Sequence, residues 1–369
     1  MIKGIVVLET YIFISLISIY LVYADEIKYN NLKLKNKISF FTILIISLLF
    51  TAFNIFSTNI SLEYGSDRIN YAYEFTGLRS SGSVALDFLF KIFREFGGNI
   101  EIFFYFTTFI CVFLTLLAYR ISKKTNYKVF ILLLTSEWIL FTITALKQTY
   151  ACVFSYFFFI FLTEYDNKKY GTIFSIIFAI LASMFHITGL IFFPLLILLK
   201  MKKITEKKLM ILLLLIISSI FLLKPLSLFF KEIVGIFFPV YEIKINSYFT
   251  KGTNILGISS FSFIKYLPIY YIAILGIIKK KYILDIENYD HYLIISVLGA
   301  GLVGYTVASY WFSRFNGIFY FPMFIFYDLL NSKIKNRLEH KCNDIIVYGG
   351  SFLMLTRKII LIFVNYGQF

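Results

Sequence analysis

Apolar runs long enough to cross a bilayer recur along the whole chain. A membrane-spanning helix needs about 20 mostly apolar residues to cross a hydrocarbon core of roughly 30 Å. One such run, at residues 5–23, reads "IVVLETYIFISLISIYLVY", and 59% of the 369 residues are hydrophobic while only 15% are charged. A water-soluble domain cannot bury that much apolar surface. The sequence therefore predicts an all-α, polytopic integral membrane protein.

We predict about twelve membrane-spanning helices in a single membrane domain that covers residues 1–369. The first apolar run shows no convincing cleavage site and many spans follow it, so we interpret it as a retained helix and not as a signal peptide. Near His186, two short runs are typical either of two short tilted helices or of one broken helix. The predicted cores of the spans are 4–24, 38–57, 101–119, 129–143, 146–163, 171–185, 187–199, 209–223, 261–278, 292–310, 315–330 and 345–364.

The distribution of basic residues predicts the orientation of these spans. About 22 of the 36 lysines and arginines fall in six short loops, such as "RISKKTNYK" and "KMKKITEKK". Cytoplasmic loops of membrane proteins carry this excess, so we place the six loops inside and the N-terminus outside. The net charge of +15 is thereby explained without nucleic-acid binding, and we predict no nucleic-acid partner.

Two longer segments, roughly 58–100 and 224–260, fall on the outer side in this topology. Each contains a stretch in which apolar residues recur at three- and four-residue spacing, at 84–96 and 226–241. Such stretches are typical of amphipathic helices that lie in the membrane interface. We therefore predict two longer extracytoplasmic loops that carry amphipathic helices.

Polar residues from four separate stretches share the outer boundary of the membrane. The stretch "SLEYGSDRINYAYEF", at 61–75, is joined there by the pair Lys147 and Gln148, by His186 in "ASMFHITGL" and by Arg314 in "SYWFSRFNG". Ionisable groups near hydrocarbon are costly and often functional. Each also has a structural explanation, because lysine and arginine can extend to head groups, a histidine can cap a turn, and Asp67 beside Arg68 can form an exposed ion pair.

The residue types at this boundary suit glycosyl transfer from a lipid pyrophosphate. Cations would hold a pyrophosphate by charge-assisted hydrogen bonds, a carboxylate would act as general base on a sugar hydroxyl, and aromatic residues such as Tyr71 would pack on sugar faces. The sequence contains no nucleotide-binding motif and no DxD metal pair, and Cys111, Cys152 and Cys342 lack metal-site spacing. We predict no metal site and no cofactor.

The order and spacing of several segments resemble those of the EpsG family, from about residue 60 to 330. These segments are "GSDRINYAYEF", "SVALDFLFKIF", "ALKQTYACVFSYFFFI", "ILASMFHITGLIFFPLLIL" and "FSRFNGIFYF". Members of this family are Wzy-like polymerases of bacterial exopolysaccharide, capsule and O-antigen. The resemblance implies a protein of the bacterial cytoplasmic (inner) membrane. Its implied partners are an undecaprenyl-pyrophosphate-linked oligosaccharide, the lipid bilayer, a chain-length regulator and a flippase.

The resemblance also implies roles for individual residues. Asp67, His186 and Arg314 match the family's catalytic positions, with Asp67 as the base or a sugar-binding acid. Two positions depart from the family pattern, because Lys147 stands where arginine is usual and Ser83 stands where an acidic residue is common, which leaves Asp87 as the nearest acid. The expected substrate-binding residues are Arg68, Tyr71, Lys147, Gln148 and Asp87.

Three other functions remain open at the level of sequence. A flippase for the same lipid-linked unit would use polar groups deep in the bundle, for which Glu137, Lys265 and the pair Arg357 and Lys358 are candidates. An O-antigen ligase shares the chemistry of a polymerase and differs in its acceptor. A membrane O-acyltransferase would place its histidine nearer the cytoplasm than the predicted topology places His186.

Overall fold

The computed structural model shows a helical chain. It describes residues 2–31, 38–60, 66–136, 138, 142, 145–165, 169–199, 208, 211, 214, 232, 266–283, 286–308 and 315–363. Every regular element among these residues is helical, which confirms the predicted all-α class. The chain divides into two compact units, one formed by Met1–Leu195 with Met354–Phe369 and the other by Leu196–Leu353.

Within the described residues, four helices are long and apolar enough to cross a membrane, and all four belong to the first unit. Their backbone polar groups are bonded within the helix, as a hydrocarbon core requires. They coincide with the predicted spans 4–24, 38–57, 101–119 and 146–163 and indicate a membrane protein, whereas the total of twelve spans stays a prediction. The helices are α1 (Ile2–Asn31), α2 (Phe40–Ile60), α5 (Ile100–Ile121) and α8 (Leu146–Glu164).

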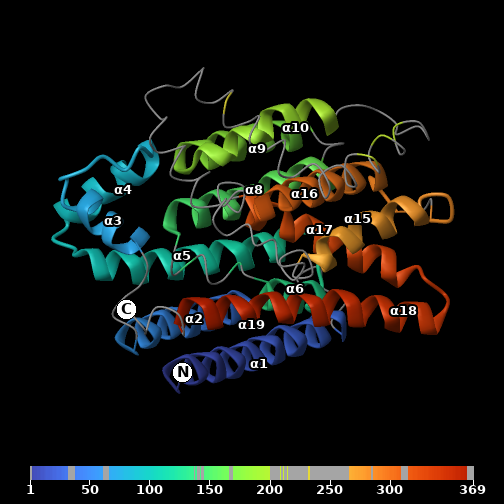
Figure 1. Ribbon diagram of the computed structural model, residues 1–369, viewed down its shortest axis with the longest axis horizontal. Helices are drawn as coiled ribbons and strands as arrows, with labels where there is room; N and C mark the ends of the chain where they lie inside the picture. Colours follow the sequence, from blue (N-terminus) through green and yellow to red (C-terminus); the bar gives the residue numbers. More distant parts are fainter. Residues whose placement is uncertain are drawn as a thin grey trace. The chain divides into compact units, whose positions relative to one another are not determined.

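Shorter helices complete the first unit (Figure 1). The predicted span 129–143 is interrupted at Ser136, whose extended backbone ends its first helix after nine residues. The predicted break near residue 186 is present, because a 3-10 helix, η1, follows directly after His186. The short helices are α3 (Ser66–Phe75), α4 (Val84–Glu95), α6 (Tyr127–Thr135), α9 (Lys169–Phe185), η1 (Ile187–Ile191) and, at the boundary of the units, α10 (Phe192–Leu199).

The predicted outer loop 58–100 contains α3 and α4, which pack on the first turns of α5 (Figure 1). Their shared core includes Phe75, Phe90 and Phe103, with ring centroids 5.4 Å apart for the first two and 4.8 Å apart for the last two. On its other side α4 exposes Val84 and Phe88, as an interfacial helix would. The second predicted amphipathic helix, 226–241, lies outside the described residues apart from position 232.

An aromatic ladder joins α9 to α8 along their length. Phe157 on α8 stacks on Phe178 of α9 with centroids 4.9 Å apart, and Tyr150 near the start of α8 stacks on Phe185 at 4.4 Å. Offset stacked pairs of this kind add to the free energy of burying the rings. The ladder therefore holds the end of α9, and with it His186, beside the beginning of α8.

Two hydrogen bonds join segments at the ends of the helices of the first unit. At the predicted cytoplasmic side, the Ser122 hydroxyl after α5 donates to Glu164 at the end of α8 over 2.5 Å. At the predicted outer side, the Ser83 hydroxyl before α4 donates to the carbonyl of Met184 in α9 over 3.0 Å. Each bond joins two segments that the sequence places on the same side of the membrane.

The second unit is also helical where it is described. In it, Gly276 of α15 faces the ring of Phe326 so closely that a side chain at 276 would clash. Near its predicted cytoplasmic end, Asp344 accepts hydrogen bonds from Tyr327 and Asn331 and lies 3.2 Å from His340. Its helices are α15 (Leu267–Lys279), α16 (Tyr289–Ala308), α17 (Asn316–Ser332), α18 (Arg337–Asp344), the π-helical turn η4 (Ile345–Gly349) and α19 (Gly350–Phe363), which leads back to the first unit.

We expect Gly189→Ala to destabilise the turn that carries His186. A Cβ at 189 would lie 2.4 Å from the backbone nitrogen of Ser183, and backbone atoms cannot move aside cheaply. Overpacking of this kind costs about 1–3 kcal/mol. Thermal unfolding of the purified protein in detergent should show a lower melting temperature. Gly301→Ala is the control, because its Cβ would meet open space, and equal melting temperatures for the two variants would contradict the expectation.

Candidate functional site

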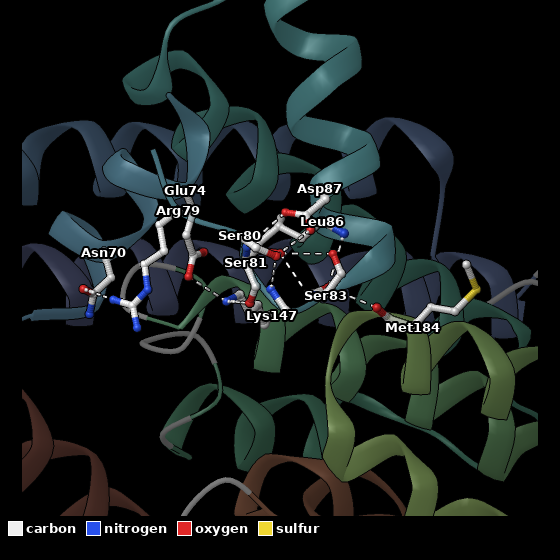
Figure 2. A network of polar contacts seen from close by, with 11 residues as sticks. Asn70, Glu74, Arg79, Ser80, Ser81, Ser83, Leu86, Asp87, Lys147 and Met184 are labelled. Carbon is white, nitrogen blue, oxygen red and sulfur yellow. Dashed lines mark hydrogen bonds and ion pairs between the residues drawn. The ribbon is translucent and has the colours of Figure 1, made fainter. Parts of the chain in front are cut away.

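A buried ion pair lies at the centre of the predicted outer cluster. Lys147, in the first turn of α8, places its Nζ 3.0 Å from Oε1 of Glu74, in the last turn of α3. The two side chains are 16% and 7% exposed. Figure 2 shows the pair beside the loop that connects α3 to α4.

Further contacts surround the ammonium group of Lys147. Its Nζ donates to the carbonyl of Ser81 over 2.5 Å and lies 5.3 Å from the centroid of the Tyr71 ring. A cation at the N-terminus of a helix is disfavoured by the helix dipole. Glu74, the Ser81 carbonyl and the ring face together offset that cost, and they fix the position of the ammonium group.

The loop before α4 is shaped by short polar side chains (Figure 2). Ser83 is the N-cap of α4, where its hydroxyl accepts from the backbone N–H of Leu86 over 3.3 Å. Asp87 accepts from the backbone N–H of Ser81 over 3.2 Å, and Gly82 has a φ of +66° that favours glycine. Asp87 therefore holds the loop whose Ser81 carbonyl accepts from Lys147. Its predicted role in substrate binding stays a prediction.

His186 lies next to this loop through Met184, whose carbonyl accepts from Ser83. His186 caps η1, and its Nδ1 lies 3.2 Å from the backbone nitrogen of Thr188 and 2.8 Å from the Thr188 hydroxyl. Because Nδ1 accepts from a backbone N–H, the neutral ring carries its proton on Nε2. The imidazole is thus arranged as a hydrogen-bond donor at Nε2.

Other predicted residues join the same region of the first unit. The guanidinium of Arg68 lies 4.1 Å from the centroid of the Phe104 ring, and Tyr71 meets that ring edge-on at 6.3 Å. Gln148, next to Lys147, is buried. The structure thus brings together six of the eight predicted residues, namely Arg68, Tyr71, Asp87, Lys147, Gln148 and His186.

The remaining two predicted residues are less fully described. Asp67 lies in the first turn of α3, and only its backbone is described. Arg314 lies outside the described residues, as do Glu137 and Lys265. Within the described part of the chain, no group of three or more histidines, cysteines and acids could hold a metal ion.

Glu74 is a residue of this site that is absent from the residues predicted from the sequence. The spacing of the residues could have indicated it, because Asp67, Tyr71 and Glu74 stand at i, i+4 and i+7 and so share one face of a helix. The identity of its partner was not readable, since Glu74 and Lys147 are separated by 73 residues in the sequence.

Long apolar helices with polar side chains gathered in the connections at their ends define a polytopic membrane protein. The sequence profile of the EpsG family matches residues 48–366, which is most of the chain, and the protein therefore belongs to the EpsG family. This membership associates it with exopolysaccharide biosynthesis by a glycosyltransferase-like polymerase. No curated protein and no solved structure matches the chain.

We expect Lys147→Met to destabilise the protein because it leaves the Glu74 carboxylate buried without its counter-charge. Breaking one side of a buried pair costs about 3–5 kcal/mol. Adding Glu74→Gln should recover most of that loss, because both charges are then gone. Thermal unfolding of the two single variants and the double variant, purified in detergent, measures the coupling. Strictly additive effects would show that the two side chains do not interact.

Proposed function

We propose that this protein is a bacterial polysaccharide polymerase. It transfers a growing glycan from undecaprenyl pyrophosphate to the next lipid-linked repeat unit at the outer face of the cytoplasmic membrane. The match to the EpsG family over residues 48–366 carries this proposal. The gathering of predicted substrate-binding residues in one region of the first unit supports it.

In the proposed reaction, a hydroxyl oxygen of the acceptor unit attacks the anomeric carbon of the donor. The bond from that carbon to the pyrophosphate oxygen breaks, and its electron pair leaves with the lipid pyrophosphate. Cations stabilise the charge that develops on this leaving group. Lys147, Arg68 and Arg314 supply that charge in our proposal, and the reaction needs no metal ion.

The neighbouring residues of the site have matching tasks. His186 donates from Nε2 to a phosphate oxygen or a sugar hydroxyl, since its Nδ1 is bound in its own turn. Tyr71 and Gln148 line the sugar-binding side, and Asp67 binds a sugar hydroxyl or takes its proton. Lys147 offers a point charge where arginine would offer a two-pronged grip, so this chain holds the pyrophosphate by charge more than by geometry.

Deletion of the gene tests the function against its main alternative. We expect surface glycan to be reduced to single repeat units, with unpolymerised lipid-linked units at the outer leaflet. The size distribution of surface glycan and the lipid-linked pool in each leaflet give the answer. If the units accumulate instead on the cytoplasmic leaflet, the protein is a flippase. If polymer is still made but is no longer transferred to a final acceptor, the protein is a ligase.

Arg314→Ala should abolish polymerisation while leaving the protein in the membrane, because a cation on the leaving group is removed. Expression of this variant in the deletion strain, with glycan length as the readout, checks it. The control is Arg337→Ala, an exposed arginine at the start of α18 in a predicted cytoplasmic loop. Full-length polymer from the Arg314 variant would refute the assignment of this residue to the pyrophosphate.

A further inference from the structure

The carboxylate of Glu74 is only half satisfied. Its Oε1 bonds to Lys147, whereas its buried Oε2 has no hydrogen-bond partner among the residues that the structure describes. A buried charged oxygen without a partner costs more free energy than a neutral group does. Such an atom in a native structure calls for an explanation, and a catalytic role is one of them.

Another buried carboxylate of the same unit shows what a purely structural role requires. Glu164 accepts from the Ser122 hydroxyl with Oε1 and from the backbone N–H of Lys123 with Oε2, each over 2.5 Å. Both of its oxygens are thus bonded. Glu74 has a comparable burial and lacks the second bond. Within the described residues, it is the one carboxylate with a buried, unbonded oxygen.

The ion pair also constrains how Lys147 can meet an anion. In this structure its charge is already neutralised by Glu74 at 3.0 Å. A pyrophosphate that approaches Lys147 must therefore share or displace the Glu74 carboxylate. Displacement would leave both oxygens of the buried Glu74 carboxylate without Lys147 as a partner. The carboxylate is then available to accept a hydrogen bond from a sugar hydroxyl.

We propose that Glu74 is the general base that takes the proton of the acceptor sugar hydroxyl, and that the exchange of Lys147 from Glu74 to the donor pyrophosphate activates it. This inference rests on the proposed polymerase function. The acceptor hydroxyl donates to Oε2, and its oxygen attacks the anomeric carbon of the donor. The proton passes to Glu74, and the electron pair of the broken glycosyl bond leaves with the lipid pyrophosphate.

The assignment distinguishes two acids on one helix. Asp67 and Glu74 lie two turns apart on α3, at i and i+7, and therefore on the same face. Glu74 holds the buried contact to the cation. Asp67 then has the second task that its position allows, which is to bind a sugar hydroxyl.

Because Lys147 contacts Glu74 before the donor binds, the general base becomes active only when a donor is present. Before the donor binds, Lys147 holds the carboxylate of Glu74, and the Ser81 carbonyl holds Lys147. After it binds, the same ammonium group serves the leaving group and the carboxylate serves the nucleophile. Lys147 thus affects both the general base and the leaving group.

The test uses the full chain, purified and reconstituted in vesicles, with Glu74→Gln as the variant. Lipid-linked repeat units extracted from the deletion strain serve as substrate, and undecaprenyl pyrophosphate serves as the binding probe. Glutamine keeps the shape and a hydrogen bond to Lys147 and cannot take a proton. We expect polymerisation to fall by about 100-fold or more, with the affinity for undecaprenyl pyrophosphate unchanged or tighter because the negative charge that competes for Lys147 is gone.

The control is Glu95→Gln, because Glu95 is an exposed carboxylate on α4 that forms an exposed ion pair with Lys91 at 4.0 Å. This variant should polymerise like the unmodified protein. If Glu74→Gln polymerises within about threefold of the unmodified protein, a rate change too small for loss of a general base, the proposal is overturned. If the unmodified protein itself fails to extend the lipid-linked units, the proposed function fails instead.

A charge-swapped variant covers the case in which Glu74→Gln does not fold. Glu74→Lys combined with Lys147→Glu restores an ion pair of opposite direction. If the pair only holds α3 against α8, this variant should polymerise, and that result would overturn the proposal. If Glu74 is the base, the swapped variant should fold and still bind undecaprenyl pyrophosphate, because the pair keeps one cation, and it should produce no polymer.

Discussion

The exclusion of water from a bilayer governs most of this structure. Backbone polar groups in hydrocarbon must bond within their own segment, so the long apolar runs become helices. Polar side chains are then driven to the ends of those helices, where connections and head groups can satisfy them. The two best-defined polar clusters of the first unit follow this rule, because Ser122 with Glu164 and Lys147 with Glu74 both lie where helices begin or end.

The cluster around Lys147 depends on a loop built from serine and glycine. The loop at residues 81–83 makes compact turns. In it, the Ser81 hydroxyl donates to the carbonyl of Ser83 and accepts from its backbone N–H, and the Ser83 hydroxyl caps α4. The α3–α4 core of aromatic rings gives this loop a rigid support. The position of the ammonium group is thus set by packing on one side and by a carbonyl on the other, and not by its own flexible stem.

Long-range contacts limited what the sequence could predict. The four spans that form long apolar helices and the turn at His186 were predictable, since hydropathy and local spacing are properties of short segments. The interruption at Ser136 was not, because an apolar run can conceal a local break in the backbone. Six of the predicted residues lie in one region of the first unit, and their functional roles stay predictions, whereas the pairing of Glu74 with Lys147 depends on a contact between α3 and α8 that no local pattern encodes.

Ser83 has a consequence for the charge balance of this protein. The resemblance to the EpsG family implies an acidic residue at this position, and a carboxylate would cap α4 as well as serine does. A carboxylate has no proton to donate, however, and would repel the Met184 carbonyl that the serine hydroxyl now binds. In this chain a neutral hydrogen bond between α4 and α9 therefore stands where a negative charge would otherwise be. By the same resemblance a lysine replaces an arginine nearby, so this end of the helices carries one carboxylate fewer and a point charge in place of a planar guanidinium.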